Sequence, residues 1–230
     1  MLVTLHVWRV PARSVGAAFL RMAREPRRLR ALPGVRFAKL VGTGTGRSFG
    51  PGDADLTRYA AVVAWDDSGA GDPAAVDRPW ERIAGSSARL DLTPIFSRGT
   101  WSGVEPFTPA PEKTDGLVLA LTRARLRPSK ALTFWRDVPP VAAELHRAPG
   151  LLARFGMGEA PVGWQGTVSV WQGAADLTRF AYRQPEHRAV IERTAVRRWY
   201  AEDLFARFAV RDIRGDKRVL GWREEGRADA

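Results

Sequence analysis

Alternating apolar and polar positions at the start of the chain predict a β-strand over residues 2–10. Successive side chains of a strand point to opposite faces, so one face of this strand is apolar. The other face carries Thr4, His6 and Trp8. An amphipathic helix is predicted over 14–31, because apolar positions recur there at helical spacing.

The same order of elements is predicted twice: strand, helix, strand, strand, helix, strand. In the first half the elements cover residues 2–10, 14–31, 35–42, 57–65, 73–88 and 91–100. In the second half they cover residues 117–126, 129–147, 151–157, 166–172, 175–199 and 203–211. This is the order of the ferredoxin-like βαββαβ unit. We therefore predict an α+β fold in which tandem ferredoxin-like repeats pack as a fused dimeric α/β barrel.

Matches between the two halves support a duplication. The matched positions, first half before second, are Pro33 and Pro149, Gly34 and Gly150, Gly42 and Gly158, Trp65 and Trp171, and Arg98 and Arg207. The proline and glycine pairs lie 116 residues apart and the tryptophan pair 106, so the first half has a loop about ten residues longer. Their common order along both halves favours duplication over chance.

A segment rich in proline and glycine, residues 102–116, divides the chain and is predicted to be a linker. We accordingly predict an N-terminal half over 1–101, a C-terminal half over 117–215 and a tail over 216–230.

The stretch KLVGTGTGRSFG, residues 39–50, is the most glycine-rich part of the chain. A dinucleotide-binding loop needs the spacing G-x-G-x-x-G between a strand and a helix. Gly42, Gly44 and Gly46 lack that spacing, and another strand is predicted after them. We therefore predict a turn between two strands of the duplicated scaffold.

The net charge of +11 favours anionic ligands, although only four of the 36 basic residues are lysine, as in an arginine-rich proteome. No basic run is interleaved with aromatic residues, which argues against nucleic acid. Cysteine is absent, which excludes disulfides, thiolate metal ligands and cysteine nucleophiles. With no signal-peptide pattern and no apolar run of about 20 residues, we expect a cytoplasmic protein.

Histidine is the remaining candidate for chemistry. His6 lies on the first strand, where a packed core histidine is the common outcome, and His146 ends a predicted helix, where it suits the C-terminus. His187 follows Pro185 at the start of a predicted helix and shares an apolar face with Val190 and Ile191. A neutral imidazole there can bind haem iron, or it can be a core histidine bonded to a backbone carbonyl.

Four segments together resemble the spheroidene monooxygenase family of carotenoid biosynthesis. They are FAKLVGTGTG, FSRGTWSGVEPF, LTRARLRPSKALTFWRDVP and RRWYAEDLFARFAV, and the resemblance runs from Val3 to about Gly215. It implies a haem-dependent monooxygenase that oxidises a long apolar polyene with dioxygen and electrons from a ferredoxin-type donor. The repeated unit is also similar to those of chlorite dismutases and aldoxime dehydratases, which hold haem through a helix histidine. His187 is the matching ligand to the iron of haem b.

Because the first strand of the N-terminal half carries the fuller face of Thr4, His6 and Trp8, we expect the haem in the C-terminal half. There Val118, Ala120, Thr122 and Ala124 form a slim strand face that leaves room for a flat ligand. Arginines suit the haem propionates, and the nearest by sequence are Arg123, Arg125, Arg154, Arg183 and Arg188. Trp171 is expected to border the haem, and the candidates for the distal side are Arg36, His6 and the loop from Gly42 to Gly46.

Several alternatives stay open. The substrate is a small lipophilic or nitrogen-containing molecule, and the reaction is either monooxygenation or a redox-neutral dehydration or rearrangement. A non-catalytic haem-binding module and a cofactor-free oxygenase are further interpretations. Peripheral association with a membrane and formation of a homo-oligomer are compatible with the sequence.

Overall fold

A computed structural model describes residues 1–46, 51–67, 69–112, 114–127, 129, 148–159, 164–183 and 200–223. Its N-terminal half contains β1 (Val3–Arg9), α1 (Val15–Arg30), β2 (Val35–Gly44), β3 (Ala54–Trp65), α2 (Ala74–Glu81) and β4 (Ser86–Gly99). Its C-terminal half contains β5 (Val118–Leu126), β6 (Leu151–Gly158), β7 (Trp164–Trp171), α5 (Ala174–Arg183) and β8 (Tyr200–Gly215). Short 3-10 helices are η1 (Ala12–Ser14), η2 (Pro51–Asp53) and η4 (Lys217–Leu220).

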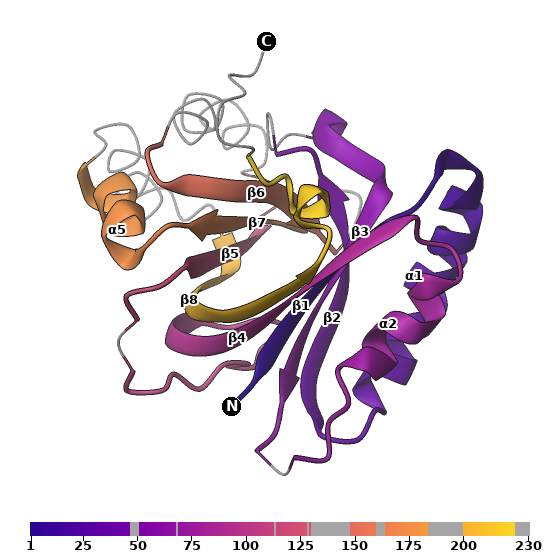
Figure 1. The fold of residues 1–230 in the computed structure, drawn as a ribbon, viewed down its shortest axis with the longest axis horizontal. Helices are drawn as coiled ribbons and strands as arrows, with labels where there is room; N and C mark the ends of the chain where they lie inside the picture. The colour runs from indigo at the N-terminus through magenta and orange to yellow at the C-terminus, as the bar shows by residue number, and fades with distance from the viewer. Residues whose placement is uncertain are drawn as a thin grey trace.

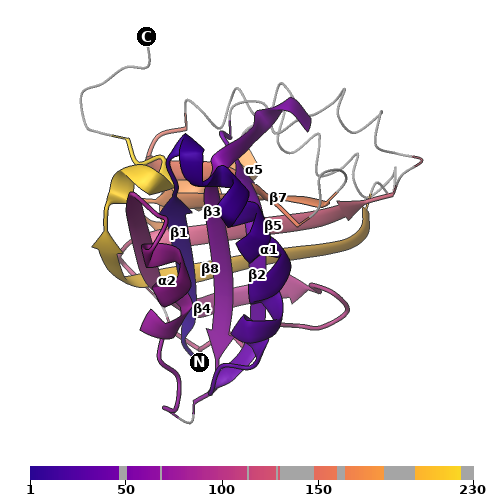
Figure 2. The ribbon, with the colours of Figure 1, turned by 90° about the vertical axis from the view of Figure 1, so that its right-hand side faces the viewer.

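The strands form one closed barrel in the order β1-β3-β2-β6-β7-β5-β8-β4, with antiparallel pairing throughout (Figure 1). Helices α1 and α2 lie against the outside of the N-terminal strands (Figure 2), and α5 lies on the C-terminal side of the barrel (Figure 1). Each half contributes four strands in the ferredoxin-like order. The predicted α+β fold with two fused ferredoxin-like units is therefore confirmed.

The two seams of the barrel reveal how the halves are related. At the first seam, Gly42 on β2 pairs with its own counterpart Gly158 on β6. At the second, Thr93 on β4 pairs with Ala209 on β8, which is also 116 residues further along. Counterparts that meet each other at both seams define a pseudo-two-fold axis, as in a symmetric dimer whose subunits have been joined.

Two details of the predicted pattern are wrong. The second helix was predicted over 73–88, but α2 ends at Glu81 and β4 begins at Ser86, because the segment from Ser86 pairs with β1 instead. Arg98 was matched to Arg207, but Arg98 pairs with Phe205. Arg207 pairs with Ala120, and Asp91 pairs with Thr4, the counterpart of Ala120. The counterpart of Arg207 is therefore Asp91.

The predicted turn in the glycine-rich stretch begins later than expected. Strand β2 extends to Gly44, two residues beyond the predicted end at Gly42, so Gly44 also lies within a strand at the seam. The chain turns afterwards at Gly46, whose φ of 76° suits glycine and whose N–H donates to Asp53 Oδ2 at 2.9 Å. The described part of the stretch thus joins the two halves of the sheet.

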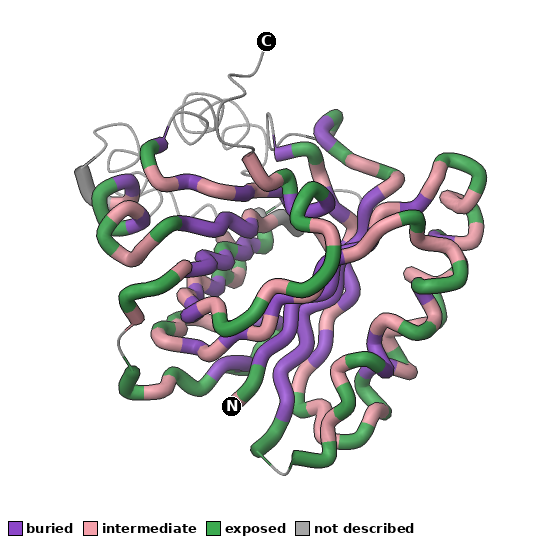
Figure 3. The backbone as a smooth tube through the Cα atoms, in the orientation of Figure 1, coloured by how far each residue is buried: buried purple, intermediate pink, exposed green. Residues whose placement is uncertain are grey.

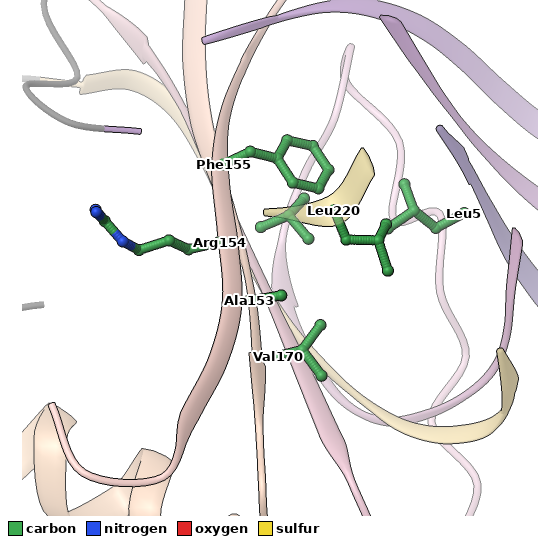
Figure 4. A pocket seen from close by; sticks show the side chains of 7 residues that line it. Leu5, Ala153, Arg154, Phe155, Val170 and Leu220 are labelled. Atoms are coloured by element: carbon green, nitrogen blue, oxygen red, sulfur yellow. The ribbon is translucent and has the colours of Figure 1, made fainter. Parts of the chain in front are cut away.

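The barrel interior is a packed apolar core, visible as the buried inner strands in Figure 3. Phe107 of the predicted linker and Trp101, which directly precedes the linker, are buried in this core, and so are Val219 and Leu220 of η4. Figure 4 shows a gap beside Leu5, Ala153, Phe155, Val170 and Leu220, but it leaves no room for a water molecule. A ligand of this gap would have to displace the core, so the interior offers no ligand site and the outer faces of the sheet are the candidates.

Candidate functional site

The outer face of the N-terminal half is filled by large side chains. Trp8 stacks on Trp80 of α2 with ring centroids 4.6 Å apart. His6 is fully buried, with Nδ1 at 2.9 Å from Asp77 Oδ1 and Nε2 at 2.9 Å from Thr4 Oγ1. The full face predicted for the first strand is thus observed, and His6 occupies it as a hydrogen-bonded core residue beneath the helices.

The equivalent face of the C-terminal half carries small side chains. The registers β1–β3 and β5–β7 superpose at the offsets of 116 and 106, so Thr4, His6 and Trp8 correspond to Ala120, Thr122 and Ala124. On neighbouring β7 the same face carries Thr167 and Ser169. We call these residues, Ala120, Thr122, Ala124, Thr167 and Ser169, the small-residue face.

The small-residue face is open at Thr122, whereas Ala120, Ala124 and Ser169 are buried. Helix α5 covers one end of it, where Leu177 and Phe180 pack with Ala120 and Trp171. Thr122, in contrast, is exposed, whereas its counterpart His6 is fully buried. The Trp171 ring lies 5.3 Å from that of Phe180, and its Nε1 donates to Ser169 Oγ at 2.9 Å, so Trp171 belongs to the covered end. The two halves therefore differ in how much of this face their own side chains fill.

An arginine that sequence reasoning missed borders the small-residue face. Arg207 on β8 pairs with Ala120, and paired residues place their side chains on the same face of a sheet. Its guanidinium carbon lies 5.3 Å from the ring centroid of Phe205 and 5.7 Å from that of Phe96. Its Nε is buried and has no hydrogen-bond partner within the described chain. The alternation in LFARF, with Leu204, Ala206 and Phe208 in the core, is the sequence signal that would have found it.

Arg154 on β6 borders the small-residue face on the side opposite Arg207. It pairs with Ser169 on β7, which in turn pairs with Ala120 on β5. Figure 4 shows its side chain pointing away from the interior gap, on the side of β6 opposite Ala153 and Phe155. Its Nη1 donates to the carbonyl oxygen of Gly46, so this guanidinium also fixes the turn after β2.

Arg123 occupies the opposite face of β5 from the small-residue face. It is buried between two carboxylates, with Nη2 at 3.2 Å from Glu159 Oε2 and Nη1 bonded to Glu202. Its guanidinium carbon lies 5.8 Å from the ring of Trp101, which donates to Glu159. Burial alone would raise the pKa of Glu202, but the Gly103 N–H, Arg123 and Thr100 lower it to about 2. This cluster fastens the linker to β5 and β8.

The other predicted site residues are dispersed or lie outside the described part. Arg36 is exposed near the start of β2, at the end of the strand away from the seam. Arg125 is exposed on β5 and shares the strand parity of Arg123. His187 and Arg188 lie outside the described residues, and so does the side chain of Arg183. Within the described chain no three histidine or acidic side chains are grouped to hold a metal ion.

A closed barrel built from two ferredoxin-like halves, with one outer face filled and the other lined by small residues, defines a fused dimeric α/β barrel protein. No protein-family profile matches the chain. The chain is 36% identical over 190 residues to spheroidene monooxygenase of Rhodobacter capsulatus, covering 80% of this chain and 78% of that protein. It is 35% identical over 187 residues to spheroidene monooxygenase of Rubrivivax gelatinosus, covering 80% and 72%. The chain therefore belongs to the spheroidene monooxygenase family.

A likeness to a solved structure supports the fold. The crystal structure of an aldoxime dehydratase aligns with a TM-score of 0.57 at 13% identity, covering 92% of this chain and 81% of that one. At this identity the likeness concerns the architecture alone.

Proposed function

We propose that this protein is a monooxygenase that oxidises a lipophilic, carotenoid-like substrate with dioxygen and external electrons. The observation that carries the proposal is the family membership, with 36% identity over most of both chains. In this proposal the reaction depends on haem b, and a ferredoxin-type protein supplies the electrons. Bound haem would supply the activation of dioxygen, which no described side chain offers by itself.

The small-residue face is where the described chain best fits a flat cofactor. Its side chains are smaller than Thr4, His6 and Trp8 at the equivalent positions of the other half, and Thr122 is exposed. The buried, unsatisfied Nε of Arg207 beside this face is the kind of group that an anionic ligand would satisfy. These features support placing the haem against β5 and β7, with His187 as the proposed iron ligand.

The contacts of three predicted site residues decide which of them can still bind the haem. Arg154 remains a candidate for a propionate, because it lies in the row of Ser169 and Ala120. Arg123 is an unsuitable clamp, because it faces the barrel interior and is bonded to Glu159 and Glu202. His6 is better explained as a structural residue of the N-terminal half, because both its ring nitrogens have partners there.

The described residues include no helix long and apolar enough to cross a membrane. Access to a lipophilic substrate by peripheral association with a membrane, and a homo-oligomeric state, stay predictions.

The experiment that tests the proposed function combines spectroscopy with isotope labelling. Purified protein should show a haem Soret band, and turnover of a carotenoid such as spheroidene should require both reductant and dioxygen. Oxygen-18 from labelled dioxygen should appear in the product by mass spectrometry. His187→Ala should lose the band while retaining the fold by circular dichroism. Labelled product formed by haem-free protein would refute haem dependence, and reductant-independent conversion of an aldoxime would favour a dehydratase.

A further inference from the structure

We infer that Arg207 is the residue that anchors an acidic group of the ligand bound on the small-residue face. This inference rests on the proposed function, in which the ligand is haem and the acidic groups are its propionates. Of the predicted arginines whose side chains the structure describes, Arg123 faces the barrel interior, Arg125 shares its strand parity, and Arg154 donates to the carbonyl oxygen of Gly46.

The position of Arg207 follows from strand register. Arg207 pairs with Ala120 on one side and with Phe96 on the other, so its side chain leaves the sheet on the small-residue face. Neighbouring strands lie about 4.8 Å apart, and Arg207 and Arg154 are separated by three such steps, or roughly 14 Å. Arg207 therefore stands at the β8 border of the face, while Arg154 stands at its β6 border.

The two aromatic rings hold the guanidinium in place. The ring centroids of Phe96 and Phe205 are 5.9 Å apart in an edge-to-face arrangement. The guanidinium carbon of Arg207 lies 5.7 Å from the first centroid and 5.3 Å from the second. Rings orient a cation at this distance but give it no hydrogen-bond acceptor. Arg207 has no carboxylate partner among the described residues, although neighbouring Arg211 is paired with Glu112 and Arg214 with Asp212.

An arginine in this state is prepared for a carboxylate. The planar guanidinium keeps its charge at any physiological pH and matches a carboxylate in two parallel hydrogen bonds. Its rotamer freedom is already restricted by the rings, so less entropy is lost on binding. Phe96 is 42% exposed, which leaves the Arg207 border reachable from solvent.

The test compares haem with haem dimethyl ester, in which both propionates are uncharged. Each porphyrin is titrated into ligand-free wild-type protein, Arg207→Gln, Arg207→Lys and Arg211→Gln, and the dissociation constants are obtained from the Soret band and tryptophan quenching. Arg211 is the matched control, because it lies on the same strand and already has acidic and hydroxyl partners. Thermal melting of each ligand-free protein checks the fold.

We expect wild-type protein to bind haem at least about tenfold more tightly than the diester, the loss typical of one charged hydrogen bond. Arg207→Gln should lose most of this preference and keep only what Arg154 contributes, Arg207→Lys should be intermediate, and Arg211→Gln should match the wild type. Equal affinity of the wild type for both porphyrins, or unchanged discrimination in folded Arg207→Gln, overturns the anchor alone. Failure of the wild type to bind either porphyrin overturns the proposed haem function with it.

Discussion

His6 on β1 and Thr122 on β5 occupy the same position in the two halves of the barrel. His6 pairs with Ala61 and Arg89, and Thr122 pairs with the corresponding residues Thr167 and Phe205. Yet His6 is fully buried and Thr122 is exposed. The N-terminal half buries this position among large side chains, and the C-terminal half leaves it open to solvent. We therefore expect opposite consequences from mutating these two positions.

Thr122→Trp should block ligand binding without unfolding the protein. Thr122 is exposed, so an indole at this position can be accommodated in the ligand-free protein while occupying the space of the small-residue face. We expect the melting temperature to fall by only a few degrees, since exposed substitutions usually cost about 0.5 kcal/mol or less. Haem affinity should fall at least tenfold, or about 1.4 kcal/mol.

The control for this substitution is Thr178→Trp on α5, which is likewise exposed and lies in the same half. It should bind haem as the wild type does. Normal haem binding by Thr122→Trp would show that the ligand lies elsewhere.

His6→Ala should destabilise the protein and leave ligand affinity unchanged. The substitution removes a buried ring and leaves Asp77 Oδ1 and Thr4 Oγ1 each without one partner. We expect a loss of about 2–4 kcal/mol in the free energy of unfolding, measured by urea denaturation. Thr122→Ala, at the equivalent position of the other half, should change stability by less than about 0.5 kcal/mol. A catalytic role for His6 would instead reveal itself as lost turnover at unchanged stability.

The architecture could be predicted because the same order of strand and helix patterns occurs in both halves of the sequence. Period-two alternation identified the strands, and counterparts such as Gly42 and Gly158 identified the halves before their pairing was known. The start of β4 was missed because Ser86 and Ser87 give no apolar signal of their own. Their pairing with Arg9 and Trp8 is a tertiary constraint that overrides local preference.

The site was harder to predict because its residues are defined by register across strands. Arg123 and Arg207 are both strand arginines among small residues, but only the pairing shows that Arg123 faces Glu202 inside and Arg207 faces outward beside Ala120. A one-residue difference in parity reverses the face. The small-residue face, in contrast, could be predicted for β5, because every second residue along this strand has a small side chain.

Glu202→Gln should weaken the dependence of stability on acid pH. The pKa of Glu202 is held at about 2 in the folded protein, against an ordinary value of 4.5. Because the folded pKa is the lower one, its contribution is complete above pH 4.5 and is lost as the pH falls toward 2. The variant should be less stable at pH 7 by about 1–3 kcal/mol, since Arg123 loses a charged partner.

The measurement is urea unfolding at a series of pH values from 7 downward. Glu112→Gln is the control, because its ion pair with Arg211 is half exposed and should contribute little. The difference between wild type and Glu202→Gln should shrink as the pH falls below 4.5. A difference that stays constant over this range would show that the carboxylate charge is not what matters.

Gly44→Ala should destabilise the seam between the halves, whereas Gly42→Ala should not. A Cβ on Gly44 would come within 2.9 Å of the Asp53 carbonyl oxygen, a backbone atom that cannot move aside cheaply. A Cβ on Gly42 would meet only the Gly158 carbonyl oxygen at 3.7 Å, an ordinary contact. We expect a loss of roughly 1–3 kcal/mol for Gly44→Ala and less than about 0.5 kcal/mol for Gly42→Ala by urea unfolding. If both variants keep their stability but lose ligand binding, the stretch is a ligand-binding loop and not only a part of the scaffold.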